Sequence, residues 1–150
     1  MSLRMDYRAA SPAGMRALGG VHHYLLESGL PNGLLELVYL RISQINGCAY
    51  CIDLHSRDLM KGCMSLEKLL LVGVWREAGG LFHEVERAAL AWAESVTRVA
   101  DTNVPDADYK AASAVFGDKQ LADLTIAIGM VNAYNRMAIS FRVPPAAARD

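Results

Sequence analysis

Long apolar runs and blocks of like charge are both missing from this sequence. The longest apolar stretches, such as LLLVGVW at 69–75, are far shorter than the roughly 20 residues that a membrane-spanning helix needs. The formal net charge is −1, and no basic run is present to bind a phosphate backbone. We therefore expect neither a membrane nor a nucleic acid among the partners.

The apolar core of a secretion signal is also missing. The opening stretch MSLRMDYRAASPAG is polar, which predicts a cytoplasmic protein. The chain has only three cysteines in 150 residues, and two of them form a close pair. Because the cytoplasm keeps thiols reduced, a close cysteine pair there is more often catalytic or metal-binding than structural.

Alternating period-two patterns are absent as well, so we expect no sheet. Turn signals at glycine and proline divide the sequence into segments with helical patterns, and no repeat or linker interrupts them. We predict an all-α fold, one domain over 1–150 with about six to seven helices. A hydrophobic fraction of 53% is high for a globular chain, which favours a homo-oligomer. The expected helical segments are 11–29, 31–47, 48–61, 65–80, 83–100, 104–117 and 118–142.

The stretch QINGCAYCIDLH carries the chemistry that stands out. Cys48 and Cys51 open the helix expected at 48–61. Unpaired N–H groups and the positive dipole end of a helix N-terminus stabilise a thiolate, which is the reactive form. The i, i+3 spacing puts both sulfurs on one face, within reach of a disulfide. His55 follows Cys51 by four residues, so its imidazole can approach that thiol as base or acid.

Other roles for the pair are weaker but stay open. A zinc site needs four ligands, and Cys63 and His22-His23 lack the spacing to complete one. A structural disulfide would close too short a loop to stabilise much. Two inert buried thiols are the remaining alternative, and Cys63 is expected to be a packing residue. We predict no bound metal, and the residues favour redox chemistry.

Glu36 is embedded in the leucine-rich stretch LLELVYL, on a helix that is apolar on nearly every side. A buried carboxylate is costly unless it is paired or protonated. Glu36 therefore needs a partner, and Arg41, another arginine or simple exposure at the helix start are the ordinary solutions.

Taken together, Glu36, the Cys-x-x-Cys and the following His55 resemble the core motif of the alkylhydroperoxidase D family, within the wider carboxymuconolactone decarboxylase-like superfamily. The stretches LLELVYLRISQINGCAYCIDLHSRD, WREAGGLFHEVERAALAWAESVT and IAIGMVNAYNRMAISFR are similar to its peroxidase-type subgroup, so the resemblance covers roughly 7–142.

The resemblance implies an all-α subunit that forms trimers or hexamers and reduces small hydroperoxides with thiols, without a cofactor. It implies Cys51 as the peroxidatic cysteine, Cys48 as the resolving one, and His55 with Glu36 as a proton relay. A dithiol would restore the enzyme, with a lipoyl-bearing protein as one candidate. A decarboxylase or lactone-processing enzyme, and a disulfide-based redox sensor or interaction module, are the alternatives.

One position departs from the family pattern. The founding enzymes carry a second histidine immediately before the second cysteine, where this chain has Tyr50. A tyrosine, with a pKa near 10, shuttles protons poorly at neutral pH.

Of the remaining polar residues, we expect His22, His23 and His83 at the surface or an interface. Asn132, Asn135 and Arg136 are expected as hydrogen-bonded structural supports or interface contacts.

Overall fold

A computed structural model describes residues 2–148, and within that range every regular element is helical. The predicted all-α class is therefore confirmed. Nine α-helices and three short 3₁₀ helices follow one another in the described part of the chain. In order, they are α1 (Tyr7–Ala10), α2 (Pro12–Leu26), α3 (Asn32–Asn46), α4 (Ala49–Lys61), α5 (Leu66–Leu71), η1 (Val72–Glu77), η2 (Gly79–Leu81), α6 (Glu84–Thr97), α7 (Val99–Thr102), α8 (Asp106–Ser113), α9 (Asp118–Phe141) and η3 (Ala146–Ala148).

Each of the seven predicted segments contains one main α-helix. The structure has more α-helices than predicted because the short helices α1 and α7, each of a single turn, were not predicted as separate elements. Asp6 creates the first of these by accepting hydrogen bonds from two backbone N–H groups of α1. The single helix predicted over 65–80 is wrong beyond Leu71. There the chain tightens into η1, and Val74 leaves helical geometry (φ −127°, ψ 30°), which allows Val72 and Trp75 to be buried.

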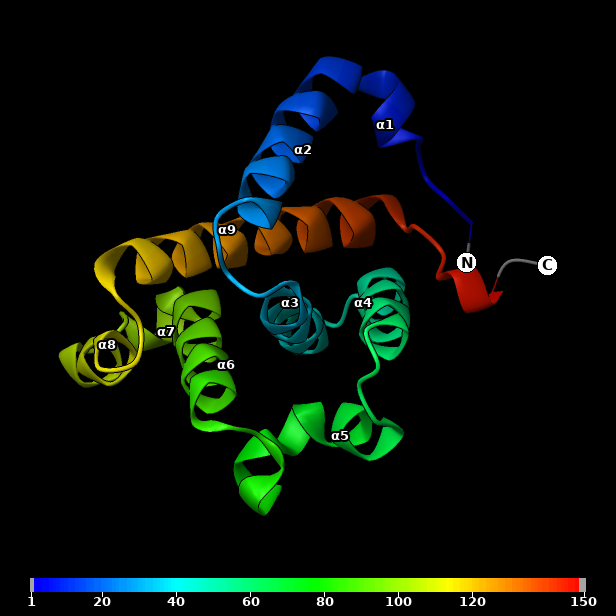
Figure 1. Cartoon of the computed structure of the whole chain (residues 1–150). Coiled ribbons are helices and arrows are strands. Elements are labelled where there is room, and N and C mark those ends of the chain that lie inside the picture. Colours follow the sequence, from blue (N-terminus) through cyan, green and yellow to red (C-terminus); the bar gives the residue numbers. More distant parts are fainter. Residues whose placement is uncertain (1, 149–150) are drawn as a thin grey trace.

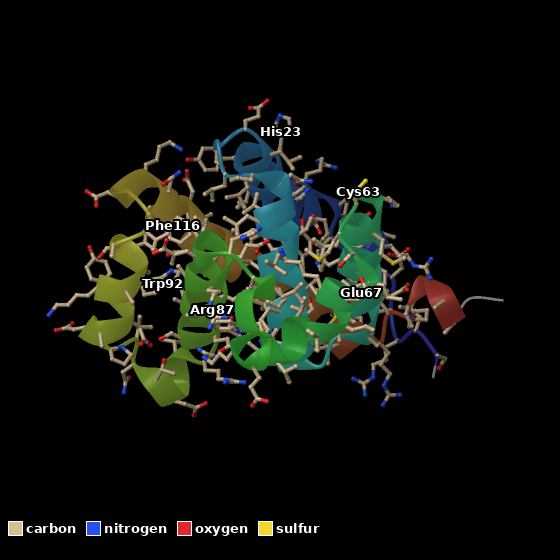
Figure 2. The ribbon with its side chains drawn as sticks, turned by 60° about the horizontal axis from the view of Figure 1, so that its bottom comes forward. His23, Cys63, Glu67, Arg87, Trp92 and Phe116 are labelled. Carbon is tan, nitrogen blue, oxygen red and sulfur yellow. A yellow bond between two sulfur atoms is a disulfide. The ribbon has the colours of Figure 1, made fainter. Side chains whose placement is uncertain are left out.

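Helix α3 lies at the centre of the molecule and packs against α4, α6 and α9 (Figure 1). This position explains why it is apolar on nearly all sides, as the sequence predicted, with nine buried residues. One hydrophobic cluster fills the space between α3, α6 and α9, and includes Trp92 and Phe116, which lie near one another in Figure 2. A second cluster around Trp75 and Phe82 packs against the other side of α3.

Helices α1 and α2 cross above α9, and α4 runs beside α3 below it (Figure 1). The first and last described residues lie on the same side of the molecule as α4, where Arg4 donates its backbone N–H to the carbonyl of Phe141. No helix within 2–148 is both long and apolar enough to cross a membrane. The arrangement leaves α1, α2, α3, α4 and α9 surrounding one region, and Cys51 lies at its edge.

Candidate active site

The turn between α3 and α4 sets the position of the cysteine pair. Gly47 ends α3 in the left-handed conformation (φ 70°), which a residue with a side chain adopts only at a cost. The next residue, Cys48, caps α4, and its Sγ accepts the backbone N–H of Cys51 at 3.4 Å. The sequence prediction that the pair opens a helix is confirmed.

The two sulfurs lie at disulfide distance, with 5.3 Å between the Cα atoms of Cys48 and Cys51. This separation lies in the ordinary range for a disulfide. Both residues are buried, at 1% and 3% exposure, and pack against Ala138 of α9. The two cysteines are therefore placed so that a disulfide can join them in this fold.

Glu36 and His55 meet across the packed surfaces of α3 and α4. The Nδ1 atom of His55 lies 2.8 Å from Oε2 of Glu36, and both side chains are largely buried, at 13% and 11% exposure. The carboxylate thus has the partner that its burial requires, and it is the histidine rather than Arg41. A hydrogen bond at Nδ1 leaves Nε2 as the ring nitrogen that can exchange a proton elsewhere.

A cavity of about 380 Å³ opens beside the pair. Cys51 and His55 both line it, whereas Cys48 and Glu36 do not. Most of its walls are apolar or aromatic, which is typical of a site for an organic ligand. The lining residues come from five helices: Tyr7, Arg8, Met15, His22, Tyr39, Tyr50, Cys51, Leu54, His55, Met130, Val131 and Tyr134.

Two tyrosines in this lining have different surroundings. Tyr39 is 1% exposed, and its ring lies 5.3 Å from that of His55. Burial, followed by the nearby negative charge of Glu36, raises the pKa of the Tyr39 hydroxyl well above its ordinary value. Tyr50 is less buried, and its hydroxyl accepts a hydrogen bond from Nη2 of Arg8 at 3.4 Å. The position where the family histidine is missing is thus linked to α1.

A polar cluster fixes the end of α3 against α9. The side-chain amide of Asn46 donates to the Oδ1 atoms of Asn132 and Asn135, at 2.9 and 2.8 Å. Asn135 in turn donates to Ser43, and Arg136 donates to Asn132. These hydrogen bonds agree with the first of the two roles predicted for the polar residues of the last helix, that of structural supports, and they hold the turn that carries Cys48.

Other predictions about polar residues have mixed outcomes. Arg41 pairs with Glu94, whose carboxylate also accepts from Arg76 and from the indole of Trp75; sequence reasoning had missed Glu94 entirely. The only sequence signal for Glu94 is an acidic residue on the apolar side of an alanine-rich helix.

The prediction that Cys63 is a packing residue is wrong, because its side chain is exposed at the periphery (Figure 2).

The three histidines other than His55 differ in their exposure. His23 and His83 are exposed, as predicted, and His23 lies at the outer edge in Figure 2. His22 is half-buried and lines the cavity, which the sequence did not indicate. Within 2–148, no group of three or more histidine, cysteine or acidic side chains is arranged to hold a metal ion.

Proteins similar to this chain indicate the family to which it belongs. Residues 12–95 match the model of the carboxymuconolactone decarboxylase family. The uncharacterised protein YdfG of Bacillus subtilis is 31% identical over 140 residues, which is 93% of this chain and 95% of YdfG. The uncharacterised protein YnjA of Escherichia coli is 35% identical over 73% of this chain, which spans 59% of YnjA.

A solved structure agrees with this placement over nearly the whole chain. A protein of unknown function from Agrobacterium tumefaciens, named as a candidate AhpD antioxidant defence protein, superposes with a TM-score of 0.92 at 37% identity and covers 96% of this chain and 98% of its own. The debrominase Bmp8 shares the fold at a TM-score of 0.82, with 18% identity over 93% of this chain and 75% of Bmp8. The chain therefore belongs to the carboxymuconolactone decarboxylase family, as an alkylhydroperoxidase D-like member.

Proposed function

We propose that this protein is a thiol-dependent reductase of hydroperoxides, with Cys48 and Cys51 as its redox pair. The observation that carries the proposal is the division of the site into two sides. Cys51 and His55 line the cavity, while the residues that support them, Cys48 and Glu36, lie behind them. A nucleophile and a proton donor thus face the space where a substrate can bind.

In the first step, the Cys51 thiolate attacks the terminal oxygen of the hydroperoxide, and the O–O bond breaks. The sulfur is oxidised to a sulfenic acid, and the other oxygen leaves as an alkoxide. His55 protonates this alkoxide to the alcohol, and the Glu36 carboxylate stabilises the imidazolium before transfer and orients its ring.

In the second step, the Cys48 thiol displaces water from the sulfenic acid and forms the disulfide. A dithiol then attacks the Sγ of Cys51, which lines the cavity, and Cys48 leaves as a thiolate. The backbone N–H that Cys48 Sγ accepts stabilises this leaving group. Attack of the reductant's second thiol releases the oxidised dithiol and returns both cysteines to the reduced state.

The walls of the cavity favour an organic hydroperoxide over hydrogen peroxide. Apolar residues such as Met15, Leu54 and Val131 line most of a space that is far larger than hydrogen peroxide needs. We further propose a dithiol reductant, with a lipoyl-bearing protein as one candidate, and a cytoplasmic trimer or hexamer. Exposed apolar side chains on α5 and η1, including Leu70 at 71% exposure, would supply part of a subunit interface.

Two other functions fit the site less well. A decarboxylase or lactone-processing enzyme would have no use for a cysteine pair with one member facing the cavity. A redox sensor would use the disulfide but would need neither a substrate cavity nor a proton donor that faces it. Multiple turnovers with a recycling dithiol separate a sensor from an enzyme.

The test uses the reduced full chain and cumene hydroperoxide. One equivalent should lower the free thiols from three per chain to one, because two enter the disulfide, and mass spectrometry should locate the bond between Cys48 and Cys51. With dihydrolipoamide in excess, the peroxide should disappear over many turnovers. A thiol count that stays at three would contradict the proposal.

A further inference from the structure

The hydroxyl of Tyr39 is an exception in this molecule. Among residues 2–148, it is the one buried side-chain oxygen or nitrogen without a hydrogen-bond partner. Leaving such a group unpaired costs about 1–3 kcal/mol. A side chain of the same shape without the oxygen, phenylalanine, would avoid that cost. An unpaired buried hydroxyl therefore points to a partner that arrives with a ligand.

The position of Tyr39 in the fold indicates where such a ligand would bind. Tyr39 comes from α3, one turn after Glu36, and its ring leans on that of His55 with a tilt of 52°. It lines the same cavity as Cys51 and His55. The wall of the cavity therefore brings together a nucleophilic sulfur, an imidazole and a tyrosine whose unpaired hydroxyl is itself buried.

The charge state of the phenol determines what it can do there. Burial and the negative charge of Glu36 keep the pKa of Tyr39 above its ordinary value, so the hydroxyl stays protonated at any physiological pH. It is a permanent hydrogen-bond donor and never a base. A donor of this kind stabilises an oxygen that gains negative charge, as oxyanion holes do.

We propose that the Tyr39 hydroxyl donates a hydrogen bond to the inner oxygen of a bound organic hydroperoxide, the oxygen that becomes the alcohol. As the sulfur of Cys51 takes the terminal oxygen, the electron pair of the O–O bond moves to this inner oxygen. Tyr39 keeps its own proton and shares it in a hydrogen bond, while His55 supplies the proton that completes the alcohol. The inference rests on the proposed peroxidase function and adds a substrate contact to it.

The first experiment compares Tyr39→Phe with the wild type in single-turnover oxidation by cumene hydroperoxide. The second-order rate constant should fall by roughly 10- to 100-fold, as expected for one lost hydrogen bond to a charged oxygen. Alkylation of Cys51 by iodoacetamide should change little, because that reaction has no oxygen leaving group. Tyr109→Phe, an exposed tyrosine on α8 outside the cavity, is the matched control and should leave both rates unchanged. An equal loss in oxidation and alkylation would overturn the proposal, because Tyr39 would then act only through the thiol.

The second experiment needs no turnover and so separates the two proposals. The reduced protein is titrated with 2-phenyl-2-propanol, the product alcohol, and with tert-butylbenzene, which has a methyl group in place of the hydroxyl. The ratio of the two affinities should shift against the alcohol by about fivefold in Tyr39→Phe, as expected for one lost hydrogen bond. An unchanged ratio would refute the contact. If the wild type is not oxidised by hydroperoxides, the proposed function fails, but this ratio still decides the role of Tyr39.

Discussion

The Nδ1 atom of His55 lies only 2.8 Å from a carboxylate oxygen of Glu36, across the contact between α3 and α4. Each helix contributes one member, so neither side chain has this partner in an isolated helix. The carboxylate fixes the orientation of the ring and leaves Nε2 for proton exchange in the cavity.

This pairing predicts that the two residues act as one unit. Glu36→Gln or His55→Gln should each lower the rate of peroxide reduction at pH 7 by roughly 10²- to 10⁴-fold, the range for a general acid–base group. The double variant should lose little more than the worse single variant, because one relay is broken in each case. Steady-state rates in a double-mutant cycle give the answer, and fully additive losses would reduce Glu36 to a structural ion pair.

The two cysteines should respond differently to substitution because only Cys51 lines the cavity. Cys51→Ser should abolish peroxide consumption. Cys48→Ser should still be oxidised once and should hold a sulfenic acid on Cys51, which dimedone labelling and mass spectrometry can detect. Added dihydrolipoamide should then return Cys51 to the thiol through a mixed disulfide that the reductant's second thiol breaks at once. Oxidation of Cys51→Ser but not of Cys48→Ser would reverse the two roles.

Local patterns predicted most of the fold, and their failures have local causes. Glycine and proline positions located each main helix, because these residues determine where a helix can begin and end. The 65–80 segment was predicted as one helix, but the α-helix ends at Leu71. Beyond it, burial of the Trp75 indole against Glu94, which lies 19 residues further along the chain, overrides the local preference. Long-range packing of this kind leaves no periodic signal.

The site was predictable only where sequence neighbours are also spatial neighbours. The Cys48–Cys51–His55 face follows from helical spacing. The contact between Glu36 and His55 came from a resemblance, because 19 residues and a turn separate them. The cavity could not be predicted, since Tyr39 and its neighbours converge there from five helices that share no motif.

Tyr50 should limit turnover relative to a variant with the family's histidine. Resolution and reduction both require proton transfers, which a histidine with a pKa near 6.5 performs at neutral pH and a tyrosine near 10 does not. Tyr50→His should raise the steady-state rate with a dithiol by up to about tenfold, because His55 already serves. Tyr50→Phe should cost little beyond the hydrogen bond from Arg8. A large loss in Tyr50→Phe would make the phenol itself catalytic.

Glu94 should make the stability of the fold depend on pH. Burial opposes its ionisation, but hydrogen bonds from Arg76, Trp75 and Arg41 outweigh burial and hold the pKa of Glu94 below the ordinary 4.5. A lowered pKa means that the stabilisation is fully present above the unfolded-state value and is lost as the pH falls through the folded-state value. Glu94→Gln should lower the free energy of unfolding by about 3 kcal/mol at pH 7. Urea denaturation from pH 7 to pH 3 should show this difference shrinking below about pH 4.5. A difference that stays constant with pH would assign the loss to packing instead.

Arg8 should give the cavity a preference for a substrate with a negatively charged end. Its guanidinium lies at the cavity wall, and within 2–148 no carboxylate oxygen approaches it within salt-bridge distance. A fatty acid hydroperoxide can place its carboxylate there and its chain against the apolar walls. Arg8→Gln should therefore lower kcat/KM for the acid by about three- to tenfold at low salt. The methyl ester of the same hydroperoxide should be unaffected, because it carries no charge. Arg16→Gln, an exposed arginine on α2 outside the cavity lining, is the matched control and should change neither rate. Equal losses for acid and ester would mean that Arg8 acts by holding Tyr50. Added salt would then leave the loss caused by Arg8→Gln unchanged. If Arg8 instead attracts the carboxylate, screening by salt should make that loss smaller.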